Sequence, residues 1–341
     1  MNRTALYFSA PKQVELRQEP LPSLGAGDVL VETILSAVSA GTEMLVYQGR
    51  FPRGLEADPV IEALRGGFQY PLTYGYACVG RVIETSKSVD QELVGRSVFA
   101  FHPHASHFVA KAESLIPIPL SLSPESACFL PNMETAVNLV QDAAPILGER
   151  VLVLGQGTVG LLSASLLHEF PLEVLVTADR HELRRKASVD IGVSASLDPG
   201  ASDFHAAAVR LSNRKNYDLT LELSGSPSAL DDAIALTAFS GRVVIGSWYG
   251  EKRAPIDLGG TFHRSRLKLI SSQVSTIAPE LSGRWDKARR FEVAWRALER
   301  IKPENWITHR FPLEEAQEAY RLLDENPNET IQVIFQYTTD K

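Results

Sequence analysis

The sequence predicts an α/β protein in which an antiparallel β domain is joined to a doubly wound parallel-sheet domain. The chain has 341 residues, 44% of them hydrophobic, which is enough for two separate cores. From Val29 to about Ala110, short β-branched and apolar runs alternate with Gly, Pro and Ser turns, as in antiparallel sheets. From Arg150 onward, apolar strands alternate with helical stretches, which is typical of parallel strands joined by right-handed crossovers.

Charge and composition exclude several kinds of partner. The net charge of −7 comes from 34 basic and 41 acidic residues without long runs, so no basic surface is expected for nucleic acid or an anionic membrane. The N-terminal residues MNRTALYFSAPKQVELR contain neither a signal-peptide core nor a spanning helix. We therefore expect a cytoplasmic protein with a small-molecule substrate. Cys78 and Cys128 are expected to be small buried hydrophobes, because two cysteines make neither a disulfide framework nor a four-cysteine zinc lobe.

A helix is expected where the two patterns meet. After Leu120, the segment SPESACFLPNMETAVNLVQDA has apolar residues at helical spacing, and Ser123 with Glu125 gives it a capped start. A change of domain is expected near this helix. At the other end of the chain, KARRFEVAWRALERI and PLEEAQEAYRLLDEN predict two amphipathic helices, and TIQVIFQY predicts a final strand.

A phosphate-binding turn is predicted in VLVLGQGTVGLLSASLL, where a strand runs through three glycines into a helix. Gly155 permits the tight turn, Gly157 lets the backbone approach a pyrophosphate, and Gly160 allows close helix packing. Asp179 follows the second strand, 24 residues after Gly155, and an acid there favours NAD over NADP. The alternatives are a glycine turn that binds nothing and an Asp179 that is only a surface acid. Three nearby basic residues weaken the preference for NAD, namely Arg180, Arg184 and Arg185.

Six stretches resemble the medium-chain dehydrogenase/reductase family over nearly the whole chain. They are GAGDVLVETILSAVSAGTEM, YGYACVGRV, SLIPIPLSLSPESA, the glycine turn, YDLTLELSG and FPLEEAQEAYRLL. The resemblance implies a GroES-like β domain of residues 1–130 and 275–341, a Rossmann domain of residues 131–274, and an active site in the cleft between them. It implies hydride transfer with NAD, NADP being possible, and a homodimer paired through an exposed strand edge in PIDLGG or RLKLISSQV.

The resemblance also implies which residues contact the dinucleotide. Thr135 is expected to touch the nicotinamide. The full expected set is Thr135, Gly155, Gln156, Gly157, Thr158, Val159, Gly160, Asp179, Arg180, Ser224 and Gly246.

The chain departs from the zinc-dependent members of that family at the metal ligands. Ala40 stands where they have a cysteine, Tyr76 where they have a histidine, and Pro131 at the third ligand position. Catalytic zinc needs three protein ligands, so no metal site is expected. The Ala-Gly-Thr-Glu variant and SSQVSTIAPELSGRW resemble a zinc-free branch that includes bacteriochlorophyllide dehydrogenase-like proteins.

Without a metal, another group must handle the proton of an alcohol substrate. Thr42 occupies the family's proton-relay position, and Tyr76 is a candidate hydrogen-bond donor to the substrate oxygen. Glu43 and Glu134 are candidate bases if burial raises the pKa of either carboxyl. The alternatives are a Thr42 that only stabilises a turn, a Tyr76 that only packs, and carboxylates that are exposed or paired with arginine.

Three further groups of residues have open interpretations. His102, His104 and His107 could bind a metal or a substrate, or could be loop and core histidines. His263 with Arg264 and Arg266 could meet an acidic substrate or coat the surface. Five aromatic residues could line an apolar pocket or belong to the core: Tyr47, Tyr74, Trp248, Tyr249 and Trp285.

Three functions are consistent with the sequence. The preferred hypothesis is a zinc-independent NAD(P)-dependent dehydrogenase that acts on a secondary alcohol or ketone. The second is an NADPH-dependent enone or quinone reductase, which needs no zinc because conjugation spreads the charge of the intermediate. The third is a non-catalytic dinucleotide-binding redox sensor.

Overall fold

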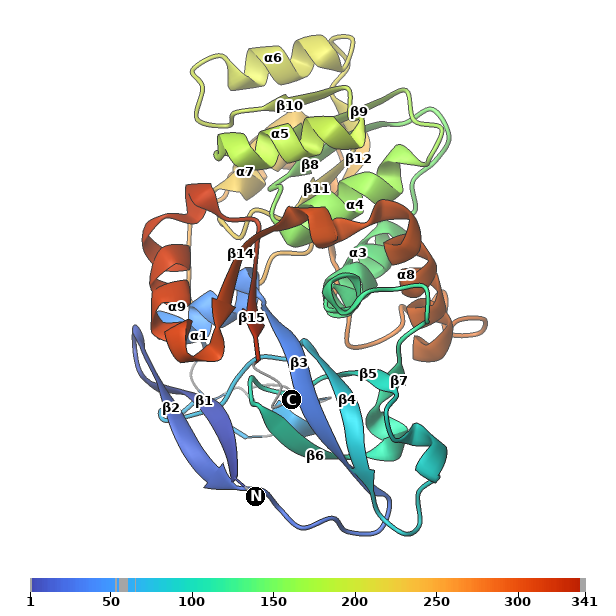
Figure 1. Ribbon diagram of the computed structural model, residues 1–341. Coiled ribbons are helices and arrows are strands. Elements are labelled where there is room, and N and C mark those ends of the chain that lie inside the picture. Colours follow the sequence, from blue (N-terminus) through green and yellow to red (C-terminus); the bar gives the residue numbers. More distant parts are fainter. Residues whose placement is uncertain (1, 53, 55–60, 65, 338–341) are drawn as a thin grey trace. The chain divides into compact units, whose positions relative to one another are not determined.

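The computed structural model in Figure 1 describes residues 2–52, 54, 61–64 and 66–337. The chain divides into two compact units, Met1–Pro131 with Lys302–Lys341, and Asn132–Ile301. The α/β class is confirmed, because one unit is built on a mostly antiparallel sheet and the other on a parallel sheet. Residues 275–301 are part of the second unit, whereas the resemblance implies that they belong to the β domain; the exact domain limits stay a prediction.

The first unit contains a two-stranded hairpin and a seven-stranded sheet. The hairpin pairs β1 with β2, and the larger sheet has the order β14-β15-β3-β4-β5-β7, with β6 also paired to β3. All pairings in it are antiparallel except that of β14 with β15. The strands are β1 (Asn2–Ala10), β2 (Gln13–Pro20), β3 (Asp28–Val38), β4 (Cys78–Thr85), β5 (Ser97–Ala100), β6 (His107–Lys111), β7 (Ile116–Pro117), β14 (Ile307–Pro312) and β15 (Gln332–Gln336).

Two helices of this unit carry side chains of its candidate site. Helix α1 (Ala40–Tyr47) follows β3 directly, and α9 (Ala316–Glu325) packs beside it. Both contribute to one apolar core, in which Val46 of α1 and Tyr320 of α9 meet Phe8 of β1 and Phe335 of β15. Helix α2 (Pro124–Ala127) is short, and its N-cap Ser123 accepts a hydrogen bond from the Ser126 N–H, as the sequence predicts.

The second unit is a six-stranded parallel sheet of order β10-β9-β8-β11-β12-β13. Its strands are β8 (Arg150–Leu154), β9 (Val174–Ala178), β10 (Ala195–Leu197), β11 (Tyr217–Glu222), β12 (Thr237–Ile245) and β13 (Lys268–Ser271). Its helices are α4 (Thr158–His168), α5 (Glu182–Ile191), α6 (Phe204–Leu211), α7 (Ala229–Leu236) and α8 (Lys287–Ile301), together with most of α3 (Leu130–Ala143). Strand β13, from the segment RLKLISSQV, forms one end of the sheet.

Both faces of this sheet are buried, as a continuous apolar strand pattern requires. Along β8, Leu152 and Leu154 pack on the face covered by α6 and α7, while Val151 and Val153 pack on the face covered by α3 and α4. Successive side chains of a strand point to opposite faces, so a strand without polar positions must be covered on both sides.

The strand order reverses between β8 and β11, with β9 and β10 on one side and β12 and β13 on the other. In open α/β sheets, ligands bind beyond the carboxyl ends of the strands at such a reversal. The loops after β8 and β11 are therefore the part of this unit to search for a cofactor site. Across the described ranges of the chain, no helix is long and apolar enough to cross a membrane.

Candidate active site

The three glycines after β8 have three different surroundings. Gly155 has a φ of +92°, and a Cβ there would lie 2.5 Å from the Cα of Ser224. A Cβ on Gly160 would lie 2.0 Å from the Gly155 carbonyl oxygen. On Gly157, in contrast, no described atom would come within 4 Å of a Cβ. Two of the glycines are thus required for packing, whereas Gly157 leaves the backbone open to a ligand.

The open position is also the beginning of a helix. Gly157 is the N-cap of α4, and Thr158 and Val159 form its first turn. The first N–H groups of an α-helix have no acceptor within the helix, and the helix dipole adds positive potential there. This arrangement fits a phosphate group.

Asp179 is held beside this turn by backbone donors. Its carboxylate accepts the Gln156 N–H at 2.7 Å and the His181 N–H at 2.8 Å, one on each oxygen. A carboxylate oxygen can accept two hydrogen bonds, so both oxygens keep the capacity to accept from a ligand hydroxyl. Gln156 is itself fixed, because its Nε2 donates to the Gly155 carbonyl at 2.9 Å.

The three arginines near Asp179 differ in their surroundings. Arg180 is exposed. Arg185 donates from Nη1 to the carbonyls of Asp179 and Arg180 at 2.9 and 2.8 Å, which ties α5 to the end of β9. Burial lowers the pKa of the Arg184 guanidinium, and the Asp179 carboxylate opposes that effect.

The loops after β11 and β12 are joined through a buried carboxylate. Glu222, the last residue of β11, has no exposed surface. It accepts hydrogen bonds from the Ser224 N–H at 2.8 Å and from the Tyr249 hydroxyl at 2.5 Å. Burial of the Tyr249 phenol, together with the nearby Glu222 carboxylate, raises the pKa of that phenol. Gly246 is required by close packing, because a Cβ there would lie 2.5 Å from Cδ2 of Leu139.

Helix α3 carries Glu134 and Thr135 next to each other. Glu134 is buried and its Oε1 accepts from Nε and Nη2 of Arg290 at 3.0 and 2.6 Å. Burial raises the pKa of the Glu134 carboxyl although the Arg290 guanidinium opposes it. Thr135 is less buried than its neighbours on either side in the sequence.

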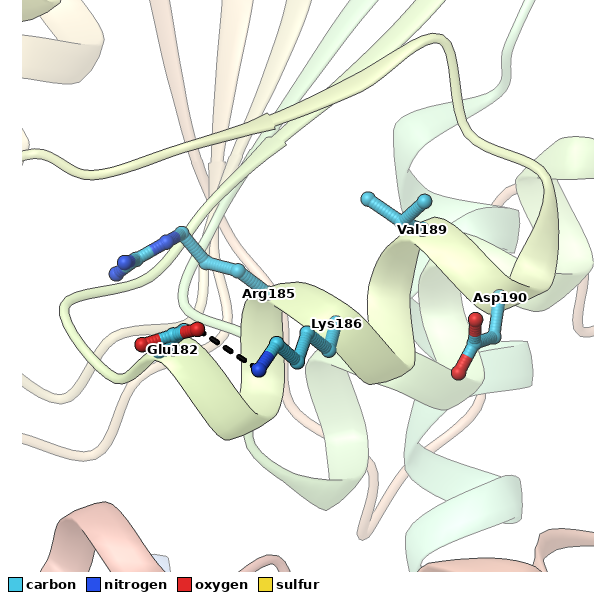
Figure 2. Close-up of a pocket in the computed structure, with 5 residues that line it drawn as sticks. All are labelled: Glu182, Arg185, Lys186, Val189 and Asp190. Atoms are coloured by element: carbon cyan, nitrogen blue, oxygen red, sulfur yellow. Dashed lines mark ion pairs between the residues drawn. The ribbon is translucent and has the colours of Figure 1, made fainter.

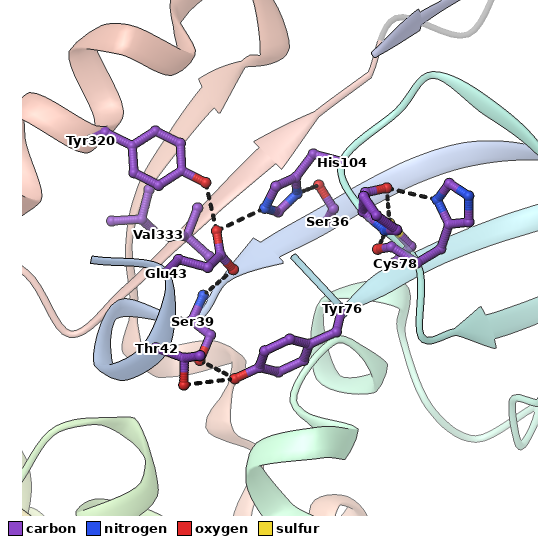
Figure 3. Close-up of polar contacts among 12 residues, drawn as sticks. Ser36, Ser39, Thr42, Glu43, Tyr76, Cys78, His104, Tyr320 and Val333 are labelled. Carbon is purple, nitrogen blue, oxygen red and sulfur yellow. Dashed lines mark hydrogen bonds and ion pairs between the residues drawn. The ribbon is translucent and has the colours of Figure 1, made fainter. Parts of the chain in front are cut away.

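In the first unit, three hydroxyl groups meet where α1 begins (Figure 3). The Tyr76 hydroxyl lies 2.5 Å from Oγ of Ser39 and 3.2 Å from Oγ1 of Thr42. We call Ser39, Thr42 and Tyr76 the hydroxyl cluster. All three residues are only half-buried, so the cluster lies close to the surface of its unit.

Glu43 lies behind this cluster and is fully buried. Its carboxylate accepts from the Ser39 N–H at 2.8 Å, from Nε2 of His104 at 3.0 Å and from the Tyr320 hydroxyl at 2.5 Å. The other ring nitrogen of His104 lies 2.7 Å from Oγ of Ser36. Figure 3 shows that these side chains come from α1, α9, β3 and the loop before β6.

The other histidines singled out in the sequence, and the two arginines beside His263, lie apart from the hydroxyl cluster and Glu43 in the contacts described. His102 stacks on Phe108 at 4.1 Å, and its Nδ1 lies 2.7 Å from the Pro103 carbonyl oxygen. His107 lies 3.1 Å from Oγ of Ser106. His263, Arg264 and Arg266 are exposed. Within the residues that the structure describes, no three His, Cys, Asp or Glu side chains gather as a metal site.

The aromatic residues are mostly engaged elsewhere. Tyr47 and Tyr74 are buried in the core of the first unit. Trp285 packs under the guanidinium of Arg289 at 4.2 Å. Trp248 is 37% exposed.

A surface depression lies on α5 (Figure 2). Lys186 and Glu182 form an ion pair of 2.8 Å across it, one helical turn apart. The lining residues are Glu182, Arg185, Lys186, Val189 and Asp190. An open patch of this kind on a single helix gives no reason to place a substrate there.

Comparisons with known proteins agree with this architecture. A family model for zinc-binding dehydrogenases matches residues 158–291. The chain is 26% identical to 2-desacetyl-2-hydroxyethyl bacteriochlorophyllide A dehydrogenase of Cereibacter sphaeroides, over 96% of each chain. The chain belongs to the medium-chain, zinc-type dehydrogenase family. As a member of this medium-chain family, it is an NAD(P)-dependent oxidoreductase.

Solved structures of the same fold carry both dinucleotides. An alcohol dehydrogenase from Escherichia coli CFT073, complexed with NADH, aligns with a TM-score of 0.78 at 19% identity, over 98% of this chain and 99% of that one. A zinc-binding dehydrogenase from Sinorhizobium meliloti 1021, bound to NADP, aligns with a TM-score of 0.77 at 20% identity, over 98% and 99%. At these identities the likeness establishes the fold of the medium-chain dehydrogenases.

The side chains at the metal-ligand positions of zinc-dependent medium-chain dehydrogenases do not fit a zinc ion here. Ala40 and Pro131 have no donor atom, and the Tyr76 hydroxyl is engaged with two other hydroxyls. The usual protein ligands of zinc are thiolates, imidazoles and carboxylates.

Several residues of the site are not evident from the sequence. Ser39, His104 and Tyr320 all donate to Glu43, although 277 residues separate Tyr320 from Glu43. His104 belongs to a histidine group that the sequence singles out, but its partner does not follow from spacing. The glycine at position 75 is a signal of this contact in the sequence. The structure shows why glycine is required there: its φ is +111°, and a Cβ would lie 2.7 Å from Nε2 of His104.

Proposed function

We propose that this chain is a zinc-independent, NAD(P)-dependent dehydrogenase that interconverts a secondary alcohol and a ketone. The observation that carries the proposal is the hydroxyl cluster, in which Tyr76 stands at a family metal-ligand position and bonds to Ser39 and Thr42. A dehydrogenase must stabilise the substrate oxygen as its proton leaves, and a phenol can donate a hydrogen bond to that oxygen.

The cofactor site we propose lies on the second unit. When bound, the nicotinamide ring supplies the hydride acceptor or donor. The open backbone at Gly157 and the first turn of α4 support phosphate binding, and Asp179 supports hydrogen bonding to the ribose hydroxyls. We propose NAD as the preferred cofactor, because a carboxylate repels the 2′-phosphate of NADP; exposed Arg180 favours some use of NADP.

In the proposed reaction, the first unit handles the proton. In ketone reduction, the hydride passes from the nicotinamide to the carbonyl carbon and the Tyr76 hydroxyl gives its proton to the substrate oxygen. The half-buried Thr42 and Ser39 hydroxyls hold Tyr76 in position and pass a proton from water back to it; in alcohol oxidation the same proton travels the opposite way, to water. Glu43 is not proposed as the base, because three protein donors already occupy its carboxylate. Glu134 is not proposed either, because it is buried against Arg290.

The first experiment is a titration of metal-free protein with NADH and NADPH, followed by nicotinamide fluorescence, with elemental analysis of the same sample. We expect tighter binding of NADH and no stoichiometric zinc. Turnover is then followed at 340 nm with a panel of secondary alcohols, including butane-2,3-diol and cyclohexanol. Turnover that requires added zinc would refute the proposal, as would binding of neither dinucleotide. Activity confined to enones or quinones with NADPH would assign the chain to the reductases, and binding without any turnover would identify a redox sensor.

Two variants test the hydroxyl cluster once a substrate turns over. Tyr76→Phe and Thr42→Val should lower kcat by about 100-fold or more, the usual contribution of a positioned proton donor, and leave NADH affinity unchanged. The matched control is Tyr70→Phe, because the Tyr70 hydroxyl donates to the Val46 carbonyl and is not part of the hydroxyl cluster. Unchanged turnover in Tyr76→Phe would remove Tyr76 from the mechanism.

We also propose that the protein works as a cytoplasmic homodimer. Strand β13 has one neighbour, β12, in the described sheet, so its other edge can pair with a second copy about a two-fold axis. Light scattering of the purified protein should give twice the mass of 37.4 kDa, and Leu269→Pro in β13 should convert it to a monomer. A wild-type mass of one chain would contradict this assembly.

A further inference from the structure

The pair formed by Glu43 and His104 has no part in the proton transfer proposed above. Neither side chain has any exposed surface. Burying an ionised carboxylate is costly unless its lone pairs receive donors, and Glu43 receives three. Such a complete set of donors fixes the carboxylate rigidly.

The hydrogen positions in this network follow from the types of its groups. A carboxylate only accepts, so the Nε2 of His104 that faces Glu43 carries hydrogen. The Nδ1 of His104 faces Oγ of Ser36 at 2.7 Å, and that Oγ lies 2.8 Å from the Tyr337 hydroxyl. His104 is therefore held on both sides of its ring, and it holds Glu43 in turn.

The pair contacts Ser39, one partner of the short hydrogen bond in the hydroxyl cluster, and Gly75, the residue before the other partner, Tyr76. Glu43 accepts the backbone N–H of Ser39, whose Oγ lies 2.5 Å from the Tyr76 hydroxyl. His104 packs against Gly75, the residue before Tyr76, so closely that a Cβ on Gly75 would lie 2.7 Å from Nε2. A shift of either side chain would thus move Ser39 or the backbone that carries Tyr76.

We propose that Glu43 and His104 are positioning residues that hold Ser39 and Tyr76 in hydrogen-bond contact. The expected loss of turnover rests on the proposed function. The expected change at the Tyr76 hydroxyl does not rest on it, because all these contacts lie within the first unit.

The test observes the Tyr76 hydroxyl directly. The protein contains nine tyrosines, and labelling them with ¹³C at Cζ gives one NMR resonance for each, with Tyr76 assigned by its loss in Tyr76→Phe. Ser39→Ala shows how far this resonance moves when the Ser39 bond is removed. Glu43→Ala and His104→Ala should reproduce at least half of that shift. Glu43→Gln should move it less, because the amide oxygen can still accept the Ser39 N–H.

The matched control is Thr33→Val. Thr33 is a buried residue of β3 whose Oγ1 donates to the carbonyl of Ala105 at 2.6 Å. Ala105 follows His104 in the sequence, but this hydrogen bond is not part of the network around Glu43. It should leave the Tyr76 resonance in place. If the alanine variants do not fold, Glu43→Leu and His104→Gln decide the question, because leucine cannot accept the Ser39 N–H. A Tyr76 resonance at its wild-type position in the folded variants at both sites would overturn the proposal.

Turnover gives the second measurement. With any secondary alcohol that is oxidised, Glu43→Ala and His104→Ala should lower kcat by about 10- to 100-fold, the scale expected for a misplacement of about 1 Å. KM should change less than about threefold, and the Kd for NADH should be unchanged, since Tyr76 and the glycine turn belong to different units. A protein that oxidises no alcohol would contradict the proposed function, whereas the NMR result would still decide the positioning role.

Discussion

Arg290 and Glu134 form a buried ion pair in the second unit, in which Nε and Nη2 of the guanidinium bond to one carboxylate oxygen at 3.0 and 2.6 Å. Arg290 has no exposed surface and also donates to Oδ1 of Asn138 at 2.7 Å and to the Thr276 carbonyl at 3.2 Å. One side chain of α8 thereby fastens α3 and the segment after β13.

Removing this arginine should destabilise the second unit strongly. Arg290→Ala leaves a buried carboxylate without its partner, and breaking such a pair costs about 3–5 kcal/mol. The matched control on the same helix is Arg300→Ala, because the ion pair of Arg300 with Glu169 is about half exposed and worth less than about 1 kcal/mol. Urea unfolding of both variants measures the difference, and equal losses would contradict the assigned role of Arg290.

The glycine turn should separate ligand binding from folding. Gly157→Ala places a methyl group in open space, so the protein should fold with an unchanged melting temperature, but NADH affinity should fall by about tenfold or more because the backbone can no longer approach the pyrophosphate. Gly160→Ala should instead lower stability by about 1–3 kcal/mol, because its methyl group meets the Gly155 carbonyl. Fluorescence titration measures the NADH affinity and thermal unfolding measures the stability. Lost stability in Gly157→Ala, with NADH affinity unchanged, would contradict the role of Gly157 in ligand binding.

His102 should make stability sensitive to acid. Burial, opposed by the hydrogen bond to the Pro103 carbonyl, lowers the pKa of this imidazole to about 4, with Arg3 and His104 adding to the effect. The unfolded chain, with a histidine pKa of about 6.5, binds the proton first as the pH falls. The resulting loss should develop between about pH 6.5 and pH 4 and reach about 3 kcal/mol.

A non-titrating variant isolates this contribution. His102→Asn should be less stable than the wild type at pH 7, and the deficit should shrink at pH 4.5, where the wild type has lost part of its stability. Denaturant unfolding at the two pH values measures the deficits. An equal deficit at both would show that His102 does not cause the acid sensitivity.

The two thiols should be unreactive in the folded protein. Cys78 and Cys128 are free and buried, as the sequence predicts, and burial raises the pKa of both thiols. A thiolate is the reactive species, so a disulfide reagent such as DTNB should label the native protein very slowly at pH 8. Two thiols per chain should react after unfolding. Rapid labelling of the native protein would mean that one of them is exposed.

The sequence predicts the strand and helix pattern of the second unit well, because that pattern is local. VLVLG, the three glycines and the following helix lie within about twenty residues, and turn, backbone approach and helix packing each require glycine. Local rules also explain one difference: the helix expected from Ser123 onward is two helices, α2 and α3. Pro131 lacks an N–H and stands at the second residue of α3, where the first turn of a new helix tolerates it.

The buried pairs could not be predicted in the same way. His104 meets Glu43 across 61 residues and Arg290 meets Glu134 across 156, and neither periodicity nor spacing encodes such a contact. Tyr249 illustrates the same difficulty. Its aromatic ring is consistent with a pocket, but its hydroxyl bonds to Glu222, and that partner follows only from the way the loops after β11 and β12 pack.

The position of β15 between β3 and β14 affects how the chain folds during its synthesis. Residues 332–336 are made almost 300 residues after β3, which at 5–20 residues per second is roughly 15 to 60 s later. We expect the second unit to fold first on the ribosome. The first residues of β3 can already pair with β6, but residues 35–38, which pair with β15, lack a neighbour on that side until β15 is made and expose a strand edge to other chains. Pulse proteolysis of stalled nascent chains ending near residue 325 should find the second unit protected and β3 still accessible.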